Sequence, residues 1–157
     1  IQNQINFDNE FSLNERLISK SIEHFCRPKV YPNLLNKLLK TCPNKKTKRI
    51  GCTDSSDGLF QAIQDLAIAS NCKAIINYDK IPKDKYWPKG DKWDEYYFFG
   101  GEDYELVFSL PAKWAKSLSK LDDNIKAIGF FTNGEPSIEF KDNKKNKLLN
   151  HTPFKHF

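Results

Sequence analysis

Two short segments combine residue types that could do chemistry, and the first is residues 53–59, Thr-Asp-Ser-Ser-Asp-Gly-Leu. It precedes a stretch with helical periodicity. The amino end of a helix has free N–H groups and a partial positive charge, so hydroxyl and carboxylate side chains stabilise it. In this structural interpretation Ser55 or Ser56 caps the helix, Asp57 complements its dipole and Gly58 is a flexible joint.

The same segment supports a functional interpretation equally well. A helix start together with Ser56 can bind phosphate oxygens. Asp54 and Asp57 could then hold Mg²⁺, a hard cation that takes carboxylate and phosphate oxygens together. Gly58 would leave room for a large ligand to approach the backbone.

The second segment is residues 99–106, Phe-Gly-Gly-Glu-Asp-Tyr-Glu-Leu. Its adjacent glycines permit unusual backbone dihedrals. We expect Glu102 and Asp103 to lie in a turn before a strand, where they can face a ligand. A polar loop with a glycine turn is the alternative interpretation. The sequence contains no P-loop and no dinucleotide-binding fingerprint, which excludes the common nucleotide folds that carry them.

The cysteines and histidines indicate no further site. The four cysteines form no C-x-x-C pair, so free thiols that are buried or half-buried are favoured over a metal or redox site. The histidines show no nucleophile or metal pattern, and we interpret them as structural or solvated. We assign no catalytic residue. The cysteines are Cys26, Cys42, Cys52 and Cys72, and the histidines are His24, His151 and His156.

Length and composition predict one domain with its own hydrophobic core. The chain has 157 residues, of which 39% are hydrophobic and 29% charged, with a net charge of +5. This charge is too small to indicate a nucleic-acid partner, and the basic run 45–49 is expected to be a solvated loop. No stretch approaches the roughly 20 apolar residues of a membrane span, so we expect no membrane association and a cytoplasmic location. Because the chain starts at Ile1 and has no Met, we expect a fragment or a trimmed chain.

Apolar periodicity predicts both helices and strands. The predicted helices cover residues 13–25, 34–39, 59–70 and 112–121, with Ser12 and Asn71 capping the first and third. The predicted strands cover residues 50–53, 74–78, 104–110, 125–132 and 137–140. Residues 83–94 are expected to be a loop, 133–134 a turn into the last strand and 141–147 a charged turn. This mixture predicts a layered α+β or α/β domain.

The two segments, about forty residues apart, resemble motifs of the thiamine-monophosphate kinases. The string Gly100 to Leu106 is the more specific of the two. The segment 128–130, the terminal segment 154–157 and the pair 27–28 are similar to further landmarks of that family. The resemblance implies an α+β fold, a layered α/β/α domain with a mixed sheet, as in the C-terminal domain of the aminoimidazole ribonucleotide synthetase-like superfamily.

The resemblance implies an enzyme that transfers the γ-phosphoryl group of ATP to thiamine monophosphate, giving thiamine diphosphate. It places Asp54 and Asp57 on Mg²⁺ and Ser56 on ATP. It places Glu102 at the thiamine phosphate, with Phe154 packed against that substrate. A homodimeric parent enzyme is also implied.

The family's N-terminal, ATP-binding domain has no counterpart in this sequence. We therefore expect residues 1–157 to be a single C-terminal domain that is inactive alone. Two alternatives stay open, an ATP-dependent enzyme of a sister family with another acceptor, and a non-catalytic binding domain.

Overall fold

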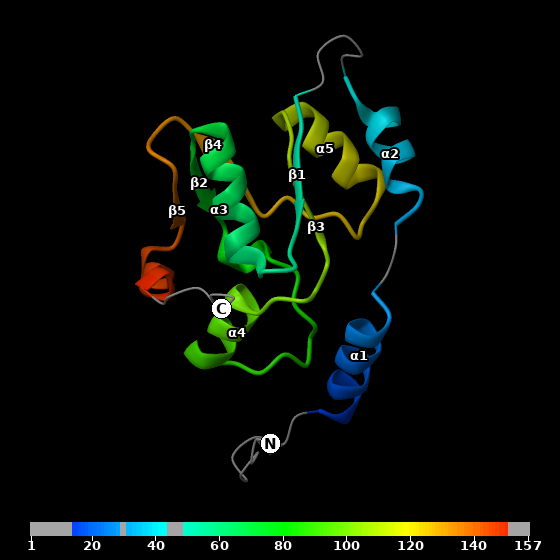
Figure 1. The fold of residues 1–157 in the computed structure, drawn as a ribbon, viewed down its shortest axis with the longest axis vertical. Coiled ribbons are helices and arrows are strands. Elements are labelled where there is room, and N and C mark those ends of the chain that lie inside the picture. The colour runs from blue at the N-terminus through cyan, green and yellow to red at the C-terminus, as the bar shows by residue number, and fades with distance from the viewer. Residues whose placement is uncertain (1–13, 29–30, 44–48, 151–157) are drawn as a thin grey trace.

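The computed structural model describes residues 14–28, 31–43 and 49–150, without the side chains of residues 143 and 144 (Figure 1). Helices and strands are interleaved along the chain, which confirms the α+β class. The elements are α1 (Glu15–Cys26), α2 (Leu34–Thr41), β1 (Gly51–Asp54), α3 (Leu59–Ser70), β2 (Lys73–Ile76), the 3-10 turn η1 (Tyr78–Lys80), α4 (Asp91–Phe99), β3 (Leu106–Ser109), α5 (Ala112–Leu121), β4 (Gly129–Thr132), β5 (Ser137–Phe140) and the 3-10 segment η2 (Asn143–Asn150).

The described strands form two sheets. The expected mixed sheet has three strands in the order β4-β2-β5, with β2 antiparallel to β4 and parallel to β5. In addition, β1 and β3 pair with each other as an antiparallel ribbon. Helix α3 contacts strands of both sheets (Figure 1). The start of α3, directly after β1, is therefore held in place by contacts of this helix with both sheets.

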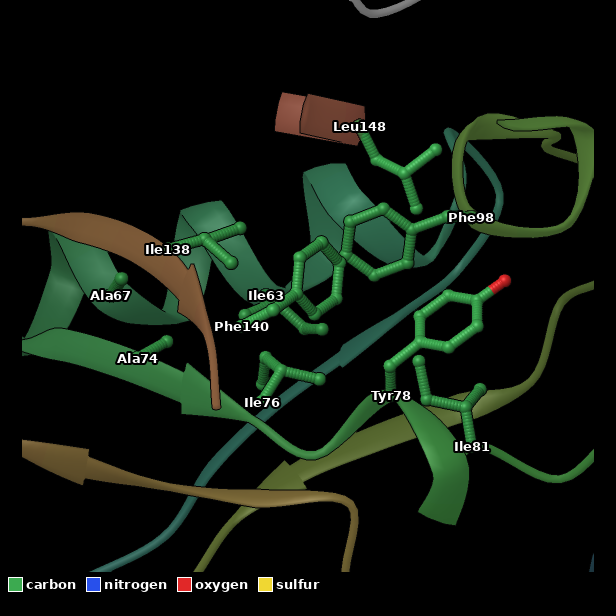
Figure 2. Packing of buried hydrophobic residues seen from close by; sticks show 10 residues of the cluster. All are labelled: Ile63, Ala67, Ala74, Ile76, Tyr78, Ile81, Phe98, Ile138, Phe140 and Leu148. Carbon is green, nitrogen blue, oxygen red and sulfur yellow. The ribbon is translucent and has the colours of Figure 1, made fainter. Parts of the chain in front are cut away.

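The main core lies between α3, α4 and one face of the mixed sheet (Figure 2). From α3, Ile63 and Ala67 are four residues apart and so share one helix face. Phe98 of α4 meets Phe140 of β5 with ring centroids 5.0 Å apart. Burying a large apolar side chain contributes about 1.5–3 kcal/mol, so this cluster stabilises the arrangement of α3 and α4. On the opposite face of the sheet, Phe130 is 60% exposed.

A smaller core joins α2 to α5. Leu38 packs with Trp114 and Leu118, which are four residues apart on α5. The Trp114 indole N–H donates to the carbonyl oxygen of Leu38 at 3.0 Å, so its polar atom is satisfied where the ring is buried. Phe108 of β3 packs against this cluster, which holds the ribbon to α2 and α5.

Several predicted elements have the expected bounds, namely the helices 59–70 and 112–121 and the strand 137–140. The predicted cap Ser12 lies outside the described residues. In the structure the N-cap of α1 is Asn14, whose side chain accepts hydrogen bonds from the N–H groups of Arg16 and Leu17. The structure also shows a 3-10 segment where the charged turn 141–147 was predicted.

The prediction of a loop over residues 83–94 is wrong at its end, because α4 begins at Asp91. The buried residues of α4 include Asp94 as well as Phe98, so its inward face is not wholly apolar. Asp94 is buried because Lys83 and Lys145 neutralise it, at 3.0 and 2.6 Å. A pattern of apolar residues cannot reveal such a helix face.

Two predicted strands are shorter than expected. The strand predicted over 104–110 begins at Leu106, because the backbone before it turns into the left-handed region. The strand predicted over 125–132 begins only at Gly129. The turn at residues 133–134 joins β4 to β5, but these strands lie on either side of β2 and do not pair with each other.

Candidate functional site

Asp54 ends β1, and its carboxylate is engaged by the turn that follows. The N–H and the hydroxyl of Ser56 both donate to Oδ1 of Asp54, at 3.1 and 2.6 Å. These hydrogen bonds lower the pKa of Asp54, so the group is ionised near neutral pH. Asp54 and Asp57 are both exposed, so the turn presents two carboxyl groups at the surface.

The helix that follows is not capped by either serine. The N-cap of α3 is Gly58, with φ +95°, and no side-chain hydrogen bond caps this end. The structural interpretation, in which Ser55 or Ser56 caps the helix, is therefore wrong. Ser55 is only 3% exposed and has a different role.

The two chemically distinctive segments are in direct contact. The N–H of Ser55 donates to the carbonyl oxygen of Glu105 at 2.9 Å, and the N–H of Glu105 donates to the Ser55 hydroxyl at 3.1 Å. The N–H of Glu102 donates to the carbonyl oxygen of Ser56 at 2.7 Å. Residues about fifty positions apart thus form one junction where β1 ends and β3 begins.

Glycines allow the two backbones to approach so closely. A Cβ on Gly101 would lie 2.3 Å from the carbonyl oxygen of Ser56, and one on Gly58 would lie 2.7 Å from that of Phe99. Real Cβ atoms do not lie this close to a carbonyl oxygen, so a residue with a side chain would not fit at either position. Both glycines are therefore required by contact between the segments, and for Gly58 also by its positive φ.

The residues after the glycines adopt an unusual backbone. Glu102 has φ +67° and Tyr104 has φ +52°, a region that residues with side chains seldom adopt. Glu102 is exposed, and the described part of the chain offers its carboxylate no hydrogen-bond or ion-pair partner. The turn before β3 thus presents the Glu102 side chain to solvent, as the sequence predicted.

Acidic and aromatic groups surround this turn. Asp103 keeps an exposed surface, but partial burial of its carboxyl group raises its pKa, which the nearby His24 opposes. Burial, with the charges of Asp103 and Glu105, raises the pKa of Tyr97 to about 12. The Tyr31 hydroxyl donates to the Glu105 carboxylate, 3.1 and 3.2 Å from its two oxygens.

Sequence reasoning did not find Tyr31 or Tyr97, and it assigned His24 no part in the site. The His24 Nε2 atom lies 2.9 Å from the carbonyl oxygen of Asp103. His24 and Tyr31 precede the turn by more than seventy residues, so no local pattern links them to it. A hydrogen-bonded, half-buried His24 agrees with the structural role predicted for it.

The donor set fits part of a magnesium site. Asp54 and Asp57 supply carboxylate oxygens, the ligands that this hard cation prefers. Within residues 14–28, 31–43 and 49–150, no three His, Cys, Asp or Glu side chains form a group that could hold a metal. A cation held by these two carboxylates would need further ligands. Phe154, the other predicted substrate contact, lies outside the described residues, as do His151 and His156.

All four cysteines lie in the described part of the chain and none forms a disulfide, but the expectation that they are buried or half-buried is wrong for two of them. Cys42 and Cys72 are half-buried, whereas Cys26 and Cys52 are exposed. Cys52 lies on β1 two residues before Asp54. Partial desolvation, with the charge of Asp54, raises the pKa of its thiol, so the less reactive protonated form is favoured.

The helices of the described chain are all too short or too polar to cross a membrane.

Known proteins with similar sequences share one name. The thiamine-monophosphate kinase of Prochlorococcus marinus is 39% identical over 123 residues, which cover 78% of this chain and 37% of that kinase. The kinase of the same name from Synechococcus elongatus is 29% identical over 150 residues, covering 94% of this chain and 45% of its own length. No family model matches the chain.

Solved structures give the same result for the fold. AaThiL complexed with AMPPCP and TMP superposes with a TM-score of 0.61 and 25% identity, covering 85% of this chain and 41% of that one. The thiamine-monophosphate kinase of Stenotrophomonas maltophilia superposes with a TM-score of 0.52 and 26% identity, over 58% of this chain and 31% of the other. This chain is thus a relative of the thiamine-monophosphate kinases that spans less than half of their length.

Proposed function

We propose that this chain is the C-terminal domain of a thiamine-monophosphate kinase. Together with the remaining part of such an enzyme, it would transfer the γ-phosphoryl group of ATP to thiamine monophosphate, giving thiamine diphosphate. The observation that carries the proposal is the junction between segments 53–59 and 99–106. It places Asp54, Ser56 and Glu102 around one backbone contact.

Phosphoryl transfer requires positioning and charge neutralisation more than covalent chemistry from the protein. In the proposal Asp54 and Asp57 contribute ligands to Mg²⁺, which when bound would neutralise charge on the phosphates. Ser56 contacts ATP. Its hydroxyl proton now points to Asp54, so it must rotate toward a phosphate oxygen to donate there. No side chain need act as a general base, because the acceptor phosphate is already ionised near neutral pH.

Glu102 is proposed to bind the thiamine side. Thiamine monophosphate carries a cationic thiazolium ring, which an ionised carboxylate attracts. The exposed Glu102 carboxylate, which has no partner among the described residues, is suited to this, and Phe154 would pack against the same substrate. ATP is supported as the phosphoryl donor by the related structure with AMPPCP. The homodimeric parent is an expectation from the resemblance, and the cytoplasmic location is an expectation from the sequence pattern.

Substituting Glu102→Gln in the two-domain parent tests this assignment. The change keeps the size of the side chain and removes its charge. We expect the KM for thiamine monophosphate to rise by about tenfold or more, since a charge-assisted contact is lost. The KM for ATP should stay close to its original value. Both are read from the rate of thiamine diphosphate formation.

The matched control is Glu135→Gln, which neutralises an exposed carboxylate in the turn between β4 and β5. It should leave both KM values unchanged. An equal rise in the KM for ATP and for thiamine monophosphate would place Glu102 on the nucleotide side. Turnover of a different phosphate acceptor in preference to thiamine monophosphate would favour the sister-family alternative.

A further inference from the structure

The backbone of segment 102–105 requires an explanation. Glu102 and Tyr104 both have left-handed φ angles, +67° and +52°. Such conformations of residues with side chains persist only where the surrounding structure holds them. The other case among the described residues, Asn71 at φ +48°, is the C-cap of α3, where a left-handed residue is ordinary. Neither Glu102 nor Tyr104 ends a helix.

The first set of contacts comes from the turn after β1. The N–H of Glu102 donates to the carbonyl oxygen of Ser56 at 2.7 Å. Ser55 and Glu105 exchange two hydrogen bonds, at 2.9 and 3.1 Å. These contacts fix the two ends of the segment, on either side of Asp103.

The second set of contacts comes from the N-terminal part of the chain. The carbonyl oxygen of Asp103 can only accept, so His24 donates to it through Nε2–H, at 2.9 Å. The same nitrogen lies 3.8 Å from Oε1 of Glu105. The Tyr31 hydroxyl donates to the Glu105 carboxylate at 3.1–3.2 Å. His24 thus holds the backbone at Asp103, and Tyr31 holds the side chain of Glu105. Both contacts come from residues outside the junction.

Helix α1 is itself attached to the body of the chain. Lys20 forms an ion pair with Asp84 at 2.9 Å, and Leu17 is buried. Lys20 and His24 are four residues apart, so they lie on the same face of α1. His24 therefore contacts Asp103 from a helix that the Lys20–Asp84 ion pair also attaches to the rest of the chain.

We propose that His24 and Tyr31 are positioning residues that hold segment 102–105, with Glu102 and Tyr104 in the left-handed region, and so fix the direction of the Glu102 side chain. The bracing itself follows from these contacts. Its consequence for substrate binding rests on the proposed function of Glu102.

Amide hydrogen exchange on the 157-residue chain tests the bracing without any assay of activity. The reporters are the N–H groups of Glu102 and Glu105, whose hydrogen bonds depend on the fixed segment. In His24→Ala and in Tyr31→Phe we expect these amides to exchange about tenfold faster, because local opening becomes easier. Amides in α3 and β2 should exchange at their original rates.

Two further variants sharpen the comparison. His24→Gln keeps a side-chain N–H donor and should restore much of the protection that His24→Ala removes. Glu23→Ala changes the exposed neighbouring residue of α1 and should have no effect. Unchanged exchange at Glu102 and Glu105 in both His24→Ala and Tyr31→Phe would overturn the proposal. Faster exchange that is equal in α3, β2 and segment 102–105 would also overturn it, because the loss would then be global.

A second measurement separates this inference from the proposed function. In the two-domain parent, Tyr31→Phe should raise the KM for thiamine monophosphate and leave the KM for ATP unchanged, as expected for Glu102→Gln. If exchange rises as expected but Glu102→Gln has no effect on either KM, the bracing is supported and the proposed role of Glu102 fails. If Glu102→Gln acts as expected while exchange is unchanged, the bracing fails and the proposed function stands.

Discussion

At the scale of single residues, the adjacent serines of the first segment have opposite roles. Ser55 is buried and hydrogen-bonded twice to Glu105, so it joins the two segments. Ser56 directs its hydroxyl to the exposed Asp54. The residue types alone could not distinguish them, because the partner of Ser55 lies fifty positions away. Ser55 is therefore a structural residue of the junction, and Ser56 is the serine that we propose contacts ATP.

The carboxylates of this turn lead to a prediction about magnesium. In the proposed two-domain enzyme, Asp54→Asn and Asp57→Asn should each lower turnover by roughly 10- to 100-fold or more, as expected when groups at a metal site are removed. Neutral amides are poorer ligands for a hard cation. The free energy of unfolding should change little, because both side chains are exposed on a turn. Turnover at several magnesium concentrations and chemical denaturation are the measurements.

The control for both variants is Asp123→Asn, at an exposed carboxylate outside the junction. It should have the original turnover at every magnesium concentration. If Asp54→Asn and Asp57→Asn both behave like this control at ordinary magnesium concentrations, the assignment of these residues to the metal is wrong.

At the scale of elements, the sequence predicted well those helices whose buried face is apolar. Helix α3 has the predicted bounds, and its buried residues Ile63, Leu66 and Ala67 follow helical spacing. Helix α4 was missed because Asp94 occupies one of its buried positions. Its partners Lys83 and Lys145 come from different parts of the chain. Such a position is neutralised only by the tertiary structure, so a local pattern does not indicate it.

The same reasoning applies to the start of β3. The sequence of residues 104–110 is typical of a strand, yet the strand begins at Leu106. The contacts that hold Glu102 and Tyr104 in the left-handed region come from Ser56 and His24, both distant in sequence. The sequence thus indicated which segments contain the candidate site. It could not indicate the backbone conformation there or the residues that brace it.

The ion cluster around Asp94 leads to a prediction about stability. The buried Asp94 carboxylate forms ion pairs with Lys83 and Lys145, whose side chains are half-buried. Asp94→Asn would leave two ammonium groups close together without their common counter-charge. We expect it to lower the free energy of unfolding by on the order of 3 kcal/mol, measured by chemical denaturation at neutral pH. The control Asp91→Asn, which removes the exposed ion pair with Lys147, should cost less than about 1 kcal/mol.

The pH dependence of stability in the original chain and in Asp94→Asn tests whether the charge of Asp94 is the cause. Burial opposes ionisation of Asp94, but hydrogen bonds from Lys145, Tyr78 and Lys83 outweigh it and lower the pKa to about 2. A lowered pKa in the folded state stabilises the fold above the unfolded value of about 3.9, and this contribution is lost as the pH falls toward 2. The original chain should therefore lose more stability than Asp94→Asn between about pH 4 and pH 2. If the free energy of unfolding falls equally in the original chain and in Asp94→Asn over that range, Asp94 does not contribute to stability through its charge.

At the scale of the whole molecule, the chain combines a well-packed core with apolar surface that it does not cover. Two sheets are joined by α3, and the main cluster buries rings from α4 and β5. On α1, however, Ile18, Ile22 and Phe25 form an exposed apolar stripe, 39–60% accessible. Contiguous exposed apolar side chains often mark an interaction surface. In the proposed two-domain enzyme, we expect the part that corresponds to the unmatched region of the relatives to cover such surface.

From this balance we predict that the 157-residue chain folds alone but does not catalyse phosphoryl transfer. A chain of this length can bury about 70% of its unfolded surface, which suffices for a stable core. Cooperative thermal unfolding, followed by circular dichroism, should confirm this. We expect no turnover, because the described residues supply only two candidate magnesium ligands at the junction. They contain no group of three His, Cys, Asp or Glu side chains that could hold a metal. The γ-phosphate must be held in line with the acceptor, and misplacement by about 1 Å can cost 10²-fold in rate.

The decisive measurement is thiamine diphosphate formation by the purified chain with ATP, Mg²⁺ and thiamine monophosphate, compared with the same chain joined to the N-terminal domain of the proposed two-domain enzyme. We expect product only from the joined protein. The Asp54→Asn form of the isolated chain controls for contaminating kinases, since a contaminant would act equally in both preparations. Product from the isolated chain that disappears in Asp54→Asn would show that this domain contains a sufficient active site. The junction between the two segments would then hold the γ-phosphate and the acceptor without further protein, and the proposal that it is one part of a larger site would be wrong.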